Sequence, residues 1–388
     1  MDFLSSIDWY LILTSLAKTV FVLIVVLTMV SYTVYAERRV SALIQDRLGP
    51  NRVGFPTTLL GTKKDFSPFL GGLGQPIADA VKLLIKEDFT PAHVNKFYYW
   101  IAPALGIGSV VVSLAVIPFG STFFGAKMVI ANIGIGPLFI FAFSSLGVYG
   151  IVLAGWSANS KYPFLGSIRS SSQMISYELA LGLSVVPLFL ILGTLNLSDI
   201  VDYQVKHGWL LFPFIADGLH IPTLSQWLLW IPVAISFVIF TISMFAETNR
   251  LPFDLPEAET ELVGGYHTEY SSMKFALFFL GEYAAMIAGS SLIVTLFLGG
   301  WHFPGIPDGS GNGGLEILHA IPAWIWGLVN IAVFFGKVAV LLLFFIWVRW
   351  TLPRFRYDQL MRLGWIFFFE IALVNVFVAA FIVALIPN

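Results

Sequence analysis

An acidic segment near residue 250 is the part of the sequence best equipped for chemistry. Residues 246–261 read AETNRLPFDLPEAETE and contain a single basic residue, Arg250. Clustered carboxylates repel one another, so at least one should hold a proton at neutral pH if water is scarce. Such a cluster can exchange protons, although an acidic loop that is simply solvated is the alternative. The acidic residues of the segment are Glu247, Asp254, Glu257, Glu259 and Glu261.

Ionisable residues also stand inside long apolar stretches. Glu178 and Glu282 lie within two such stretches, and Lys18 and Lys337 lie within two others. A charge held at membrane depth costs several kcal/mol, so these side chains should face the interior of a helix bundle or water. Proton relay and static pairing of a carboxylate with a lysine both explain the pattern, and the residues alone leave both open.

Basic residues follow the first apolar stretch. The segment from Glu37 to Gly54 contains several arginines, of which Arg38 and Arg39 are adjacent. Guanidinium groups suit salt bridges to a partner protein or contacts with lipid headgroups. The alternative is the ordinary basic belt beside a membrane helix.

Residues 75–86 have the pattern of a short amphipathic helix. Pro76 suits its first turn, and the apolar positions recur at helical spacing. We expect this helix to rest at the membrane interface or to pack against the bundle. The apolar side consists of Ile77, Val81, Leu84 and Ile85, and the polar side of Asp79, Lys82 and Lys86.

The elements that must position these residues are apolar helices. Hydrophobic residues make up 57% of the 388 residues and charged residues only 11%. A bilayer core about 30 Å thick needs roughly 20 apolar residues in a helix. We therefore predict an all-α polytopic membrane protein, a single domain over residues 1–388 with about eight transmembrane helices and an interfacial helix in the first cytoplasmic connection. The predicted spans are residues 9–36, 97–119, 130–156, 174–195, 228–246, 275–299, 324–348 and 365–386.

Lysine and arginine are distributed unequally between the connections. Alternate connections, residues 37–96, 157–173, 247–274 and 349–364, hold nine, two, two and four of the 21 basic residues. Outside the spans, the remaining connections and the termini hold only Lys127 and Lys206. Because positive charge stays on the cytoplasmic side, we predict that both termini lie on the non-cytoplasmic side.

The composition also limits cofactors and partners. The chain has no cysteine, which excludes disulfides, thiolate-bound zinc and iron–sulfur clusters held by this chain. All six histidines lie outside the predicted spans, where they cannot ligate a haem between helices. We therefore predict no metal, flavin, haem or iron–sulfur cluster on this chain. A net charge of −2 and the lack of a basic tract argue against nucleic acid as a partner.

Several motifs together resemble a known family. The sequence is similar throughout to the H-subunit family of bacterial NADH-quinone oxidoreductase, whose mitochondrial counterpart is subunit 1 of respiratory complex I. The matching segments are residues 37–54, GLGQPIADAVKLLIKED, ISYELALG, AETNRLPFDLPEAETELVGGYHTEY, residues 281–283 and WVRWTLPRFRYDQLMRLGW.

The resemblance implies a function in a larger complex of the bacterial inner membrane. A translocase component of this kind carries no redox centre and is not catalytic alone. It receives quinone from the lipid bilayer, and an iron–sulfur cluster in a neighbouring hydrophilic-arm subunit reduces that quinone, while adjacent membrane subunits pump protons. The implied quinone-chamber residues are Glu37, Arg38, Arg39, Asp79, Lys82 and Asp254. The implied proton-path residues are Glu178, Glu247, Glu257, Glu259, Glu261 and Glu282.

The chain departs from the family pattern in a few places. Ile366 and Glu370 stand where the family usually has a lysine and a proline, and Glu370 is not expected in the proton path. The segments 61–72 and 196–226 look long for the family, and 196–226 reads as a plain loop. Two other functions remain open: the equivalent component of a membrane-bound hydrogenase or another dehydrogenase complex, and a stand-alone proton-coupled transporter. No internal repeat supports the transporter.

Overall fold

The computed structural model describes residues 9–51, 53, 72–215, 224–254, 264–310, 314 and 320–385, without the side chains of residues 9–11, 224 and 225. Within these residues, eight helices are long and apolar enough to cross a membrane. The prediction of an all-α polytopic membrane protein is confirmed. Seven of these helices are α2 (Trp9–Ile44), α4 (Lys96–Ser113), α5 (Gly136–Ser157), α6 (Lys161–Leu192), α8 (Leu224–Glu247), α10 (Ser272–Phe297) and α11 (Ala323–Thr351).

The eighth long helix is composite. It begins as α12 (Tyr357–Arg362), continues as the π-helical segment η5 (Leu363–Phe369) and ends as α13 (Glu370–Leu385). The shorter elements are α3 (Gln75–Ile85), η2 (Leu114–Val116), α7 (Leu197–His207), η3 (Gly265–His267) and a small antiparallel hairpin of β1 (Thr122–Phe123) and β2 (Ala126–Lys127).

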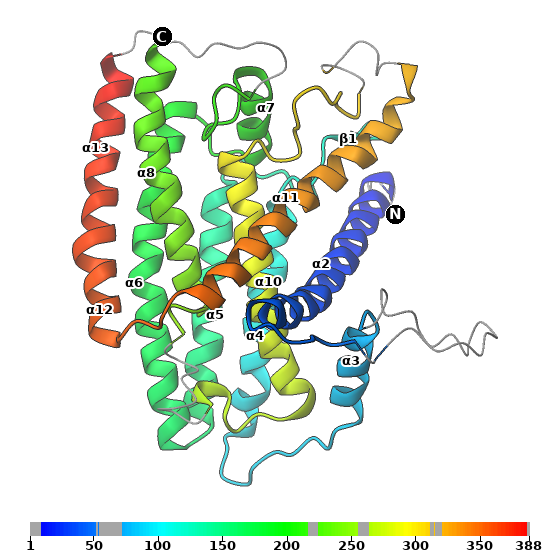
Figure 1. The fold of residues 1–388 in the computed structure, drawn as a ribbon, viewed down its shortest axis with the longest axis vertical. Coiled ribbons are helices and arrows are strands. Elements are labelled where there is room, and N and C mark those ends of the chain that lie inside the picture. The colour runs from blue at the N-terminus through cyan, green and yellow to red at the C-terminus, as the bar shows by residue number, and fades with distance from the viewer. Residues whose placement is uncertain are drawn as a thin grey trace, which may run out of the picture.

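The elements are distributed between two ends of the bundle (Figure 1). One end holds α3 and α12 and is called the α3 end here, and the other holds α7, the hairpin and the outer ends of α2 and α13. α10 runs through the centre and packs against α2, α4, α8 and α11, and most of its residues are buried. α6 packs against α5, α8 and α13. α6 and α10 therefore place many of their side chains in the interior of the bundle.

Several helix boundaries differ from those expected from the sequence. α2 continues past the predicted end at residue 36 to Ile44, so Glu37, Arg38 and Arg39 lie on a helix and not in a connection. α6 begins at Lys161, well before the predicted residue 174. The prediction that 196–226 is a plain loop is wrong, because α7 begins where the Asn196 side chain accepts a hydrogen bond from Ser198 N at 3.0 Å. A search for apolar stretches does not find polar helices such as α7 or the polar first turns of α6.

The amphipathic segment forms a helix, as predicted, and one residue of its polar side, Asp79, contacts the bundle, whereas Lys82 and Lys86 are exposed. Asp79 of α3 accepts a hydrogen bond from Arg38 of α2 at 2.8 Å. At its end, α3 is held by Ser272, whose hydroxyl donates to Leu83 O at 2.9 Å. The helix packs against α2 and α10, one of the two arrangements expected, while Ile77, Val81, Leu84 and Ile85 on its apolar side are all exposed. An interfacial position for this side stays a prediction.

A lysine caps the inner helix α10. The ammonium group of Lys337, on α11, donates to three backbone carbonyl oxygens at 2.6–3.0 Å and lies 4.0 Å from the centre of the Trp209 ring. Carbonyl groups at a helix C-terminus lack partners within the helix and carry partial negative charge, which a cation neutralises. Lys337 is therefore paired statically. Its acceptors are Leu298, Gly300 and His302.

Candidate functional site

Glu37 is the centre of a buried network of charged and aromatic side chains near the α3 end. Its carboxylate accepts a hydrogen bond from the Tyr283 hydroxyl at 2.6 Å and forms an ion pair with Arg349. Glu37 lies on α2, Tyr283 on α10 and Arg349 in the last turn of α11. The residue is only 7% exposed. A carboxylate at this depth requires such partners, because an isolated buried charge would be strongly destabilising.

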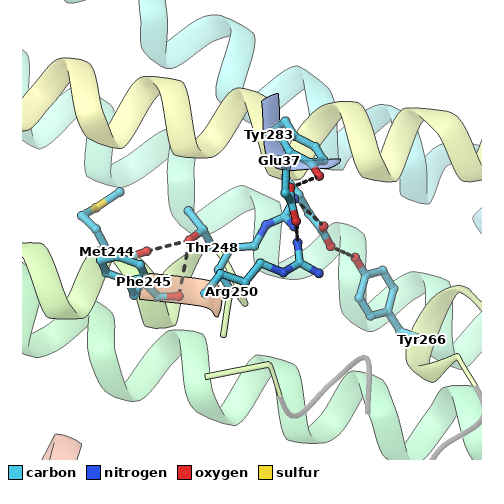
Figure 2. Close-up of polar contacts among 9 residues, drawn as sticks. Glu37, Met244, Phe245, Thr248, Arg250, Tyr266 and Tyr283 are labelled. Carbon is cyan, nitrogen blue, oxygen red and sulfur yellow. Dashed lines mark hydrogen bonds and ion pairs between the residues drawn. The ribbon is translucent and has the colours of Figure 1, made fainter. Parts of the chain in front are cut away.

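Arg250 lies between two carboxylates. Its guanidinium nitrogens are 4.0 Å from Glu37 Oε2 and 3.7 Å from Glu282 Oε2. The guanidinium also lies over the Tyr283 ring, 4.1 Å from its centre. The Tyr266 hydroxyl donates to Glu282 Oε1 at 2.8 Å. Figure 2 shows Glu37, Tyr266 and Tyr283 converging from different elements on the region around Arg250.

The charges of this network balance. Two carboxylates, Glu37 and Glu282, face two guanidiniums, Arg250 and Arg349, so the group as a whole is neutral when all four are ionised. Neutrality lets the group persist in apolar surroundings, but loss of one member leaves an uncompensated charge. A proton or a negative charge added nearby would disturb the balance and shift the shared arginine. We call the group formed by Glu37, Arg250, Tyr266, Glu282, Tyr283 and Arg349 the ion network.

The turn after α8 places Arg250 in this network. Asn249 adopts a left-handed conformation with φ 49°, which commonly ends a helix, and the Arg250 N–H closes back onto α8. The Gln173 side chain of α6 then donates at 2.8 Å to both Ala246 O and Phe253 O. One buried amide therefore holds the two ends of the turn together. These hydrogen bonds connect α6 to the turn, which begins directly after Glu247.

Glu178 and Glu247 form a second group of carboxylates between α5, α6 and α8. Glu178 accepts a hydrogen bond from Ser145, and Glu247 is hydrogen-bonded to Ser144. The two carboxylates are close enough to repel each other when both are charged. Such a pair favours a state in which the two groups share a proton. Glu247 stands three residues from Arg250, so the carboxylate pair adjoins the ion network.

Asp254 lies beside the ion network without joining it. Its carboxylate is 3.2 Å from Arg354, which precedes α12. Burial raises the pKa of Asp254 to about 6, because the favourable guanidiniums of Arg354 and Arg349 offset the loss of water only in part. The nearby Glu282 carboxylate raises this pKa further.

The remaining predicted site residues lie further out. Arg38 and Asp79 form a partly exposed pair, with 47% and 29% of their side chains accessible. Arg39 donates to Pro50 O at 3.4 Å, and Lys82 is exposed on α3. Three predicted proton-path residues, Glu257, Glu259 and Glu261, lie outside the described residues. Lys18 donates to Val129 O at 3.3 Å and, like Lys337, is paired statically.

Sequence reasoning missed five contributors to the site. Arg250 was noted only as the single basic residue of the acidic segment, and Arg349 was only counted among the basic residues of one connection. Gln173, Tyr266 and Tyr283 received no role. A glutamine inside an otherwise apolar helix is a usable signal, because a buried amide must find partners. The two tyrosines carry no such signal: Tyr283 lies in an apolar helix and Tyr266 in the short turn η3, and tyrosine is a common residue near a membrane interface. A cavity of about 210 Å³ lies at the other end of the bundle, and Lys127, Asp202 and Asp308 are among the residues that line it.

The fold and this site define a polytopic membrane protein with balanced charges buried near one end. Residues 17–380 match the family model described as NADH dehydrogenase. The chain is 46% identical over 374 residues to H subunit 1 of the NADH-quinone oxidoreductase of Geobacter metallireducens, and the match covers 95% of this chain and 96% of that protein. It is 48% identical over 361 residues to the NADH-quinone oxidoreductase H subunit of Rickettsia prowazekii, covering 92% and 90%.

The chain belongs to the family of NADH-quinone oxidoreductase H subunits. The resemblance noted from the sequence motifs is thereby confirmed, as is the prediction of a multi-pass membrane protein that forms part of an oxidoreductase complex. A third relative, H subunit 2 of the NADH-quinone oxidoreductase of Koribacter versatilis, is 44% identical over 388 residues, covering 96% of this chain and 98% of that protein.

The first prediction concerns Arg250. Arg250→Met should lower the free energy of unfolding by about 3–5 kcal/mol, because it leaves Glu37 and Glu282 without their shared cation. The measurement is the amount and thermal stability of the complex that contains this chain. Arg38→Met serves as the control and should cost less than about 1 kcal/mol, since its partner Asp79 is partly exposed. The double variant Arg250→Met/Glu282→Gln should recover part of the loss. Equal effects of Arg250→Met and Arg38→Met would contradict the assignment.

The second prediction concerns pH. The folded-state pKa of Asp254 is raised from 3.8 to about 6, so the neutral acid stabilises the fold at low pH and this contribution disappears as pH rises through 6. Asp254→Asn should therefore become progressively more stable than the wild type between pH 4 and 7, by a total of about 3 kcal/mol. Thermal unfolding of both forms over this range measures the difference. A pH-independent difference would show that Asp254 is already ionised at low pH.

Proposed function

We propose that this chain forms part of the quinone-reduction chamber of a proton-translocating NADH:quinone oxidoreductase and couples quinone reduction to proton movement. The observation that supports the proposal most is the continuity between the ion network and the Glu178–Glu247 pair. Both groups are built around the turn that follows α8, and Gln173 ties this turn to α6. Glu247 and Arg250 are three residues apart in the sequence, so a displacement of Arg250 would reach Glu247 through the backbone of the turn.

The chamber is expected at the α3 end. Arg38, Asp79 and Lys82 lie there on α2 and α3 and are at least partly exposed, whereas Glu37 and Arg250 of the ion network are buried. The network itself is closely packed, with Arg250 only 5% exposed, so the quinone head group would be received in front of it rather than within it. Neighbouring hydrophilic-arm subunits would complete the chamber and supply the electrons. This chain would contribute positive charge and proton donors.

The coupling step follows from electrostatics. Conversion of a quinone to a quinol takes two electrons and two protons, so negative charge appears in the chamber before protonation is complete. Arg250 and Arg349 would be drawn towards that charge, which weakens their hold on Glu37 and Glu282. Displacement of Arg250 moves the turn that begins at Glu247. The Glu178–Glu247 pair would then change its share of protons and bias the adjacent pump subunits.

The same proposal fixes the orientation. The α3 end would face the cytoplasm of a bacterium, because it holds the connections rich in lysine and arginine, and both termini would face away. The protein would lie in the inner membrane with quinone, lipid and the other subunits of the complex as its partners.

The third prediction tests the role of the carboxylate pair. Glu178→Gln and Glu247→Gln should leave assembly intact but lower quinone-linked turnover and proton translocation by at least about tenfold, because an amide keeps hydrogen bonds but does not ionise near neutral pH. The measurement is inhibitor-sensitive NADH:quinone activity with proton uptake in membrane vesicles. NADH oxidation with an artificial acceptor should be unchanged.

Glu87→Gln is the matched control, since Glu87 is an exposed acid after α3. It should behave as the wild type in every assay. Full quinone-linked activity and proton translocation in both Glu178→Gln and Glu247→Gln would contradict the proposal. Loss of the artificial-acceptor activity as well would point to failed assembly, which the amount of purified complex reports separately.

A further inference from the structure

Glu370 is an acid for which the site described above has no use. It begins α13, eight residues after Arg362. The π-helical segment η5 and its apolar residues separate it from that arginine, so Glu370 lies within the apolar segment. Its side chain is exposed, and among the described residues its carboxylate has neither an ion pair nor a hydrogen bond.

The exposed position follows from how α13 packs. Its inner side is fixed by Ala372, Asn375 and Ala379, which are buried, and the Asn375 amide donates to Pro232 O of α8 at 2.9 Å. At about 100° per residue, Glu370 points about 160° away from Ala372, to the opposite side of the helix. α13 stands at the edge of the bundle in Figure 1, so this outer side meets no other described part of the chain.

The surroundings of Glu370 on this outer side are large and apolar. Val374, Phe377 and Phe381 follow at helical spacing and are 60%, 68% and 66% exposed. Lipid would cover these three side chains at no cost. A carboxylate in the same row would cost several kcal/mol against lipid, so the row is better suited to protein than to hydrocarbon.

We propose that the outer side of α13 is an interface with a transmembrane helix of another subunit, and that this helix carries a lysine or arginine opposite Glu370. Charge complementarity selects this partner. A second copy of the chain related by two-fold symmetry would bring Glu370 against Glu370, which is repulsive. A soluble partner cannot reach this depth. The three apolar residues would pack against the partner helix and exclude water from the ion pair.

The first test exploits the absence of cysteine from the chain. Val374→Cys introduces a single cysteine on the outer side, which can be labelled with a benzophenone maleimide in native membranes and cross-linked by light. The expected product joins this chain to one membrane subunit of the complex, through a peptide that contains a lysine or arginine. Adducts with lipid alone, or dimers of this chain, would overturn the proposal.

The second test changes the charge, and it is the fourth prediction. Glu370→Lys should reduce the co-purification of the cross-linked subunit by at least about tenfold, because one unmatched charge in a dry contact costs more than the ~1.4 kcal/mol that a factor of ten represents. Glu87→Lys, on an exposed loop, is the control and should have no effect. Reversal of the partner's cation to an acid should restore assembly with Glu370→Lys. Normal assembly of Glu370→Lys would overturn the proposal.

The outcome is separable from that of the proposed function. Glu370 touches neither the ion network nor the Glu178–Glu247 pair, so complex that assembles with Glu370→Gln should retain wild-type quinone reduction per assembled complex. A loss of turnover without a loss of subunits in this variant would place Glu370 in the proton path and overturn its assignment as an interface residue.

Discussion

The structure depends on one requirement: two carboxylates at the inner end of α2 and in α10 must be neutralised away from bulk water. Glu37 and Glu282 come from segments far apart in the sequence, and Arg250 lies between them at 4.0 Å and 3.7 Å. Arg349 completes the balance. Such a group adds little net stability to the fold. It does restrict the positions of its members, because each becomes an unpaired buried charge if its partner moves away. The positions of α2, α10, α11 and the turn after α8 are therefore set relative to one another.

Other contacts maintain this arrangement. Gln173 fixes the turn that carries Arg250, and Lys337 caps the far end of the helix that carries Glu282 and Tyr283. In both contacts, a polar side chain inside an apolar helix donates hydrogen bonds to backbone carbonyls, because lipid has no donors to offer them. Under the proposed function, coupling between a chamber at the α3 end and the Glu178–Glu247 pair would require only a small displacement of the shared turn.

The sequence allowed the helices and most of the ionisable site residues to be predicted. Apolar length identifies a membrane span, and a charge inside a span is conspicuous, which is how Glu178 and Glu282 were found. The sequence did not indicate which charges meet, because pairing such as that of Glu37 with Arg349 depends on helix packing. It also left two positions open for α3, at the interface or against the bundle, and the contact of Asp79 with Arg38 could not be read from the amphipathic pattern. Polar helices such as α7 escape a search for apolar runs.

The central claim is that charge in the quinone chamber changes the protonation of the Glu178–Glu247 pair through Arg250. Redox-induced infrared difference spectroscopy of the purified complex measures this directly, because it detects carboxyl groups that gain or lose a proton when quinone is reduced. The account predicts a carboxyl signal that disappears in Glu247→Gln and is weakened in Arg250→Lys, which keeps the charge but alters its reach. A signal that is unchanged in both variants would contradict it.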